Sequence, residues 1–316
     1  MYMGDFSCTD NWQVLVHVCQ RWRCLVFASP RGLDLELLCT HRRAARKRLL
    51  DIWPDLPIAV YIDFKQSEGP GYHVDEANTT SALMQQHNRI SRIEILGISN
   101  SLFKAFAKIS EMTLFPVLTH LVLRSDRRDL KAIPPVPDSF LDGFGTRLRV
   151  LNLVCIPFPA LPKLLSTTTH LVTLKLEIVP PSGFISPDAM ATGLSSLKKL
   201  KTLHLDFKAC RSCALGKCRF PRLHLHREIR HSPAVTRTIL PALTHFHLCS
   251  YGEYVEAFMS QIDTPILVIA SIEFSPRRKP DTPLLRHFIS RTEAFKAPLP
   301  ARVFTDEELV YIAFFY

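Results

Sequence analysis

The hydrophobic positions of this chain repeat a short pattern, Leu-x-x-Leu-x-Leu, with Ile or Phe at some of the leucine positions. Copies begin at Ile90, Leu118, Leu148, Leu171, Leu200, Leu243 and Ile269. Their fourth positions fall at 93, 121, 151, 174, 203, 246 and 272, so successive copies are 28, 30, 23, 29, 43 and 26 residues apart. Alternation with a period of two predicts a short strand, with the fourth and sixth side chains on one face.

Stretches with the hydrophobic period of a helix separate these predicted strands. They cover Leu102 to Met112, Phe158 to Leu165, Ala189 to Leu197, Tyr254 to Ile262 and Leu284 to Phe295. Strand and helix alternating at intervals of 20–29 residues are typical of leucine-rich repeats, which stack side by side. We therefore predict an α/β fold, an irregular leucine-rich-repeat solenoid in which a curved parallel sheet carries its helices on the convex side.

The turn after each strand departs from the usual repeat. Leucine-rich repeats place Asn or Cys three positions after the last strand leucine. Here those positions hold Asp126, Ile156, Val179, Lys208 and Tyr251. The departure favours an irregular, loosely curved solenoid, and a generic α/β domain is the alternative.

The outward strand positions define a candidate binding face. If the fourth and sixth positions face the core, the third, fifth and seventh face out, as five successive triplets. The polar residues predicted to bind a target on this face are His120, Arg124, Asn152, Lys175, Glu177, His204, Asp206, His245 and His247. Mixed charge with small apolar patches suits a protein partner, whereas Lys and Arg would dominate a nucleic-acid face. The alternative is that helices or an insertion cover this side of the sheet.

An amphipathic segment precedes the repeats. Residues Trp12 to Phe27 repeat apolar side chains at three- and four-residue steps and stop at Ser29-Pro30, which predicts a helix with one apolar face. We expect Trp22 to pack against the first repeats. Leu33 to Leu37 and Ile58 to Ile62 alternate as additional, degenerate strands.

The motif Val18-Cys19-x-x-Trp22, followed by Ser29-Pro30-x-x-Leu33, resembles the second half of an F-box. Together with the repeats, the chain resembles the fungal F-box proteins that carry leucine-rich repeats. No Leu-Pro pair, with which an F-box opens, precedes Trp12, so we expect a partial F-box in residues 1–32 and a solenoid in residues 33–316. The resemblance implies that Val18, Cys19, Trp22 and Pro30 bind a Skp-type adaptor or form the F-box core.

The 43-residue spacing indicates an insertion at about residues 208–232. Lys208 to His231 contains seven Lys or Arg against Glu228, a net +6 within a chain whose net charge is +10. The same segment carries Cys210, Cys213 and Cys218, followed by His224 and His226, which are candidate zinc ligands. The irregular spacing favours a metal-free loop outside the repeat core.

Charge, cysteines and motifs narrow the possible functions. No run of about 18 apolar residues predicts a membrane span, and nine scattered cysteines, an odd number, favour a reduced cytoplasmic or nuclear protein. We find no catalytic or cofactor-binding motif. The resemblance implies a non-enzymatic subunit of an SCF-type ubiquitin ligase that binds a target through the repeat face. The alternatives are a stand-alone repeat scaffold or family relic without adaptor binding, and a basic nucleic-acid-associated protein.

Overall fold

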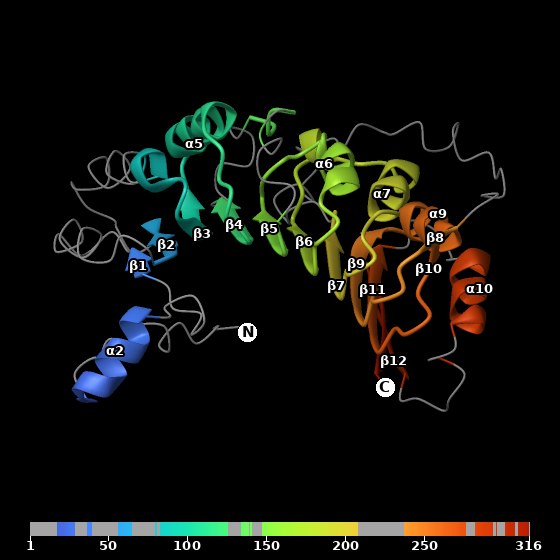
Figure 1. The fold of residues 1–316 in the computed structure, drawn as a ribbon. Helices are drawn as coiled ribbons and strands as arrows, with labels where there is room; N and C mark the ends of the chain where they lie inside the picture. Colours follow the sequence, from blue (N-terminus) through green and yellow to red (C-terminus); the bar gives the residue numbers. More distant parts are fainter. Residues whose placement is uncertain are drawn as a thin grey trace.

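The fold is built on one large, mostly parallel sheet (Figure 1). The computed structural model describes residues 18–28, 37–39, 56–64, 80, 83–125, 134–138, 140, 147–207, 237–275, 282–292, 295, 301–306 and 309–315. Parallel strands follow one another in sequence order: β1 (Leu37–Cys39), β2 (Ile58–Asp63), β3 (Ile90–Ile98), β4 (His120–Ser125), β5 (Val150–Val154), β6 (Thr173–Glu177), β7 (Thr202–Asp206), β9 (His245–Tyr251) and β11 (Ile269–Ser275). Each repeat therefore adds one strand beside the last.

The helices between the strands lie on one side of the sheet. They are α5 (Asn100–Met112), α6 (Leu161–Thr167), α7 (Pro187–Leu194), α9 (Gly252–Gln261) and α10 (Pro283–Arg291), with a 3₁₀ turn, η4 (Pro181–Gly183). Figure 1 shows the sheet bent into an arch with these helices on its outer side. The structure confirms the predicted α/β class. All five predicted helical stretches are helices in the structure, although the helix ends shift by a few residues.

Serine hydroxyls explain where two of the helices begin. Ser99 accepts a hydrogen bond from the amide of Leu102 at 3.1 Å, and Ser186 accepts one from the amide of Ala189 at 3.3 Å. An N-cap of this kind satisfies a backbone donor that the first turn cannot pair internally. These caps set the starts of α5 and α7.

The strand leucines form the core between the sheet and the helices. The fourth and sixth positions of β4, Leu121 and Leu123, are fully buried, and so is Leu118 at the first position. The equivalent leucines of β5, β6 and β7 are buried in the same way: Leu148, Leu151, Leu153, Leu171, Leu174, Leu176, Leu200, Leu203 and Leu205. This burial confirms the predicted inward positions. At roughly 1.5–3 kcal/mol for each buried leucine, it is the main stabilising contribution of every repeat.

Backbone pairing with the next strand closes the turns that lack Asn. The amide of Cys155 donates to Glu177 O at 2.9 Å, that of Val179 to Asp206 O at 3.0 Å, and that of Phe207 to Cys249 O at 2.8 Å. Two non-glycine residues at these turns adopt positive φ, Cys155 at 59° and Ile178 at 54°. For a β-branched residue such as Ile178 this conformation is strained.

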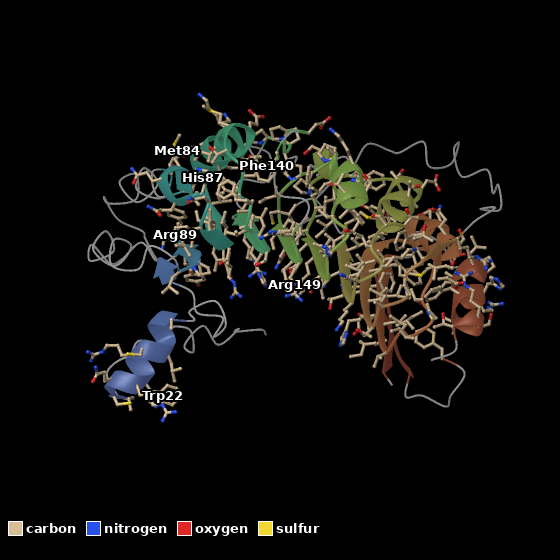
Figure 2. All side chains as sticks on the ribbon, in the orientation of Figure 1. Trp22, Met84, His87, Arg89, Phe140 and Arg149 are labelled. Atoms are coloured by element: carbon tan, nitrogen blue, oxygen red, sulfur yellow. The ribbon has the colours of Figure 1, made fainter. Side chains whose placement is uncertain are left out.

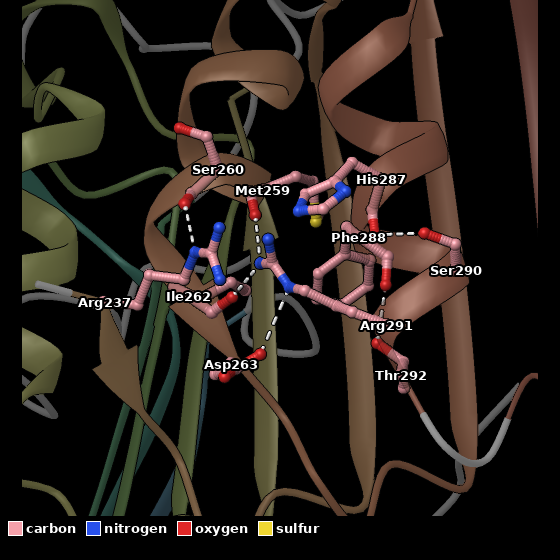
Figure 3. Close-up of polar contacts among 10 residues, drawn as sticks. All are labelled: Arg237, Met259, Ser260, Ile262, Asp263, His287, Phe288, Ser290, Arg291 and Thr292. Atoms are coloured by element: carbon pink, nitrogen blue, oxygen red, sulfur yellow. Dashed lines mark hydrogen bonds and ion pairs between the residues drawn. The ribbon is translucent and has the colours of Figure 1, made fainter. Parts of the chain in front are cut away.

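Two charged side chains tie α9 to α10, and Figure 3 shows the contacts of one of them, Arg291. The Arg291 guanidinium donates to Met259 O at 2.8 Å and to Ile262 O, at the carboxyl end of α9, and lies 3.2 Å from Asp263 Oδ1. In return, Glu256 of α9 accepts from the amides of Leu284 (2.8 Å) and Leu285 at the start of α10. Each helix therefore caps an end of its neighbour with a charge of the appropriate sign.

The chain ends differ from the sequence-based expectations. After β11 the sheet finishes with an antiparallel pair, β13 (Leu309–Phe315) and β12 (Ala301–Asp306), which the repeat pattern did not predict. A short parallel pair, β8 (Thr238–Ile239) and β10 (Ile262–Asp263), was also missed. Strand β1 lies at residues 37–39, whereas residues 33–36 of the predicted strand and the insertion at 208–232 lie outside the described residues.

The N-terminal helix α2 (Gln20–Ala28) contradicts the prediction for Trp22. Trp22 is 46% exposed, and Figure 1 places α2 apart from the sheet. The prediction that Trp22 packs against the first repeats is therefore wrong. An amphipathic pattern shows that a helix has an apolar face, but it does not show what covers that face.

Candidate protein-binding face

The five predicted triplets lie side by side on one face of the sheet. Strand pairing aligns Val122 with Asn152, Asn152 with Lys175, Lys175 with His204, and His204 with His247. The outward residues two positions earlier on each strand align in the same way, from His120 on β4 to His245 on β9. Those two positions later align from Arg124 on β4 to Glu177 on β6. The structure therefore brings together all nine polar residues that the sequence predicts for this face.

Most of these side chains are half-buried by one another, while His245 is exposed. The helices that pack on the sheet lie on its opposite side (Figure 1), so none of them covers the face. In Figure 2 the side chains of this face project away from the helices, into the concave side of the arch. Within the described residues the face is accessible to a partner.

An ion pair crosses three strands of the face. Arg124 Nη2 on β4 lies 3.4 Å from Glu177 Oε2 on β6, above Val154 of the intervening strand β5. The pair covers Val154, which is only 7% exposed although it points away from the core. This arrangement places a polar bridge beside a small apolar patch on the face.

Two histidines stack at the centre of the face. The rings of His204 and His247 are 4.1 Å apart between centroids with an interplanar angle of 28°, and His247 Nδ1 is 3.1 Å from the Ser271 hydroxyl. Burial, His247 and Lys175 lower the pKa of His204 to about 3. Burial also lowers the pKa of His247, against the opposing effect of Glu273 and Glu177. Both rings are therefore neutral at pH 7, which allows them to stack without repulsion.

The face extends beyond the five triplets. On β3, Arg92 and Glu94 align with His120 and Val122, and on β11, Ser271 and Glu273 align with His247 and Cys249. Burial raises the pKa of Glu94, while Arg92 and Arg124 lower it. The outward positions of β3 and β11 could have been read from the sequence, because the weaker copies beginning at Ile90 and Ile269 follow the same alternation.

A polar atom at the centre of the face lacks a partner. Asn152 Oδ1 is buried and accepts no hydrogen bond in the described part of the chain. An unsatisfied buried amide oxygen costs about 1–3 kcal/mol. A donor from a bound partner would satisfy it.

The apolar face of α2 is the second exposed feature. Val18, Trp22 and Leu25 are 61%, 46% and 54% exposed and follow one another at steps of four and three residues. Trp22 and Leu25, three residues apart within α2, lie on one side of that helix, and Val18 lies two residues before its start. Cys19 is exposed beside them, and Pro30 lies outside the described residues.

The predicted zinc candidates Cys210, Cys213 and Cys218 lie outside the described residues. Among the residues that are described, no group of three His, Cys, Asp or Glu could hold a metal ion. No helix in the same part of the chain is long and apolar enough to span a membrane.

Comparison with known proteins gives no family for this chain. No protein-family model matches it, and no curated protein matches it significantly. Its possible function therefore rests on the geometry described above and on the resemblance in its sequence.

Proposed function

We propose that the protein is the target-recognition subunit of an SCF-type ubiquitin ligase. In this proposal the concave face of the sheet binds a target protein, and α2 binds a Skp-type adaptor. Catalysis belongs to other subunits. The observation that carries the proposal is the continuous face from β4 to β9, with mixed charge, a fixed ion pair and an unsatisfied amide oxygen.

The order of the strands supports a leucine-rich-repeat solenoid. In the described part of the sheet, nine parallel strands lie side by side in sequence order, and in the strongest copies a buried leucine precedes the strand. Repeat proteins of this kind bind partners along an extended concave surface. The turns without Asn and the antiparallel pair at the C-terminal end distinguish this chain from a regular repeat.

The exposed apolar side of α2 supports an adaptor contact. Trp22 and Leu25 on α2, with Val18 just before the helix, place three large apolar side chains on the surface, and exposed apolar patches often mark protein interfaces. Val18 and Trp22 belong to the motif that resembles an F-box. A stand-alone repeat scaffold would use the same concave face without this contact.

Site-specific photo-crosslinking tests the concave face. A photo-reactive amino acid replaces Asn152 at the centre of the face, and in a control it replaces the exposed Lys104 on α5, on the opposite side. We expect a discrete crosslinked partner from position 152, lost on Lys175→Glu, and none from position 104. Equal crosslinking from both positions, or crosslinking from position 104 only, would contradict the proposal.

A further inference from the structure

A cluster of basic residues flanks the buried first leucine of the three central repeats. The triads read Arg147-Leu148-Arg149, His170-Leu171-Val172 and Lys199-Leu200-Lys201, and Lys198 precedes the third. The repeats on either side are neutral at the same positions, with Val117 and Thr119 before β4 and Ala242 and Thr244 before β9. We call the six basic residues, Arg147, Arg149, His170, Lys198, Lys199 and Lys201, the basic rim.

The basic rim lies along the edge of the sheet where the parallel strands begin. Val172 N donates to Arg149 O, and Lys201 N donates to Val172 O, each at 2.8 Å. Arg149 and Lys201 therefore occupy equivalent positions two strands apart, about 10 Å from each other. Figure 2 places Arg149 at the margin of the sheet, away from the helices.

All six side chains of the basic rim are exposed, and none forms an ion pair with a described residue. Lys199 Nζ lies 3.2 Å from His170 Nδ1, and Lys198 Nζ donates to Ile239 O at 3.4 Å. The segments that lead into β4, β5, β6, β7 and β9, residues 113–119, 147–149, 168–172, 195–201 and 237–244, contain no Asp or Glu. No described residue of these segments therefore neutralises the positive charge of the rim.

The opposite edge of the same face has the opposite sign. Near the ends of the strands, Glu177, Asp206 and Glu273 face the concave side, with Arg124 as the nearby cation. Glu177 lies in the row of Val154, five residues beyond Arg149 along the strand direction, or about 16 Å. Among the residues that the structure describes, the concave face is thus positive at one edge and negative at the other.

We infer that the basic rim binds an acidic segment of the target protein, which lies along the edge across β5, β6 and β7. The inference rests on the proposed function of the concave face. Because the rim is about 10 Å long between Arg149 and Lys201, three to four extended residues are enough to span it. A nucleic acid fits this surface less well, because its phosphates would extend over the carboxylates of the opposite edge.

Binding of labelled peptides to the full chain tests the inference. The probes are a short poly-glutamate peptide, a poly-glutamine peptide of the same length, and single- and double-stranded oligonucleotides. The variant is Arg149→Glu with Lys201→Glu, and the matched control is Lys104→Glu with Lys108→Glu on α5, which changes the net charge equally. We expect the acidic peptide to bind wild type and to lose about tenfold or more in affinity in the rim variant only, with weaker binding at high salt.

Three results would overturn the inference: no binding of the acidic peptide, an equal loss in the control variant, or tighter binding of an oligonucleotide than of the peptide at the same salt concentration. Crosslinking from position 152 is measured on the same rim variant. If the rim variant keeps both its crosslinking and its affinity for the acidic peptide, the inference about the rim is rejected but the proposed function is not. If crosslinking is absent even in wild type, the proposed function is rejected. Thermal unfolding of both variants confirms that each is folded.

Discussion

At the scale of single residues, the stacked pair His204 and His247 sets a condition on pH. The folded-state pKa of His204 is lowered to about 3 from an ordinary value of 6.5, because the ring is buried beside His247 and Lys175. The unfolded chain therefore binds the proton more readily, and the free energy of unfolding falls as the pH decreases from about 6.5 toward 3. The pair is stable above this range, where both rings are neutral.

Replacing His204 with Gln removes this dependence. Between pH 7 and pH 5, we expect wild type to lose about 1 kcal/mol more in free energy of unfolding than His204→Gln, a value reduced for the partial solvation of the face. Urea unfolding at several pH values measures the difference. The control is His287→Gln, an exposed histidine on α10, which should lose as much as wild type. Parallel curves for wild type and His204→Gln would show that the stack does not hold the ring neutral.

At the scale of elements, the capping between α9 and α10 fixes the last repeats. Burial and the neighbouring Arg237 lower the pKa of Arg291, and Asp263 raises it. The guanidinium donates to two backbone carbonyls at the end of α9, those of Met259 and Ile262 (Figure 3). Arg291 therefore contributes through hydrogen bonds that water replaces poorly in this half-buried position.

Substitution of Arg291 with Met keeps the length of the side chain and removes the donors. We expect Arg291→Met to lower the free energy of unfolding by about 2–3 kcal/mol. Arg286→Met, at an exposed position of the same helix, should change it by less than about 0.5 kcal/mol. Chemical denaturation of both variants gives the comparison. Equal effects would mean that the contacts of Arg291 with α9 do not stabilise the fold.

The strands could be predicted more reliably than the elements around them. The pattern Leu-x-x-Leu-x-Leu fixes which side chains are buried, so the repeat strands β3, β4, β5, β6, β7, β9 and β11 and the five outward triplets followed from the sequence. The antiparallel pair β12 and β13 carries no such repeat and depends on pairing across the sheet. The position of α2 also could not be predicted, because a periodicity does not specify a partner.

At the candidate site, the basic rim also could not be predicted from the sequence alone. Arg147, Arg149, Lys199 and Lys201 are readable in the sequence as basic residues around a leucine. Their assembly into one edge requires the strand alignment of three repeats, which brings Arg149 and Lys201 onto strands that are separated by one intervening strand. The stack of His204 on His247 likewise crosses the long insertion between β7 and β9.

At the scale of the whole molecule, the chain presents two separate exposed surfaces. The concave face is polar and, among the described residues, polarised in charge, and buried leucine, isoleucine or phenylalanine side chains anchor the strands under it. The side of α2 that carries Trp22 and Leu25, with Val18 just before the helix, is apolar, and α2 lies apart from the sheet. Two surfaces of different chemistry fit a subunit that joins a target to an adaptor.

The adaptor contact is the most direct test of this account. Isothermal titration of the purified full chain with a purified Skp-type adaptor measures the affinity for wild type, for Trp22→Ala with Leu25→Ala, and for the exposed control Gln20→Ala. Because Trp22 and Leu25 are exposed, we expect unchanged melting temperatures in all three proteins.

We predict saturable binding for wild type and Gln20→Ala, and a loss of about tenfold or more for Trp22→Ala with Leu25→Ala. The absence of binding by wild type, or equal affinity in the Trp22 and Leu25 variant, would contradict the assignment to a ubiquitin-ligase complex.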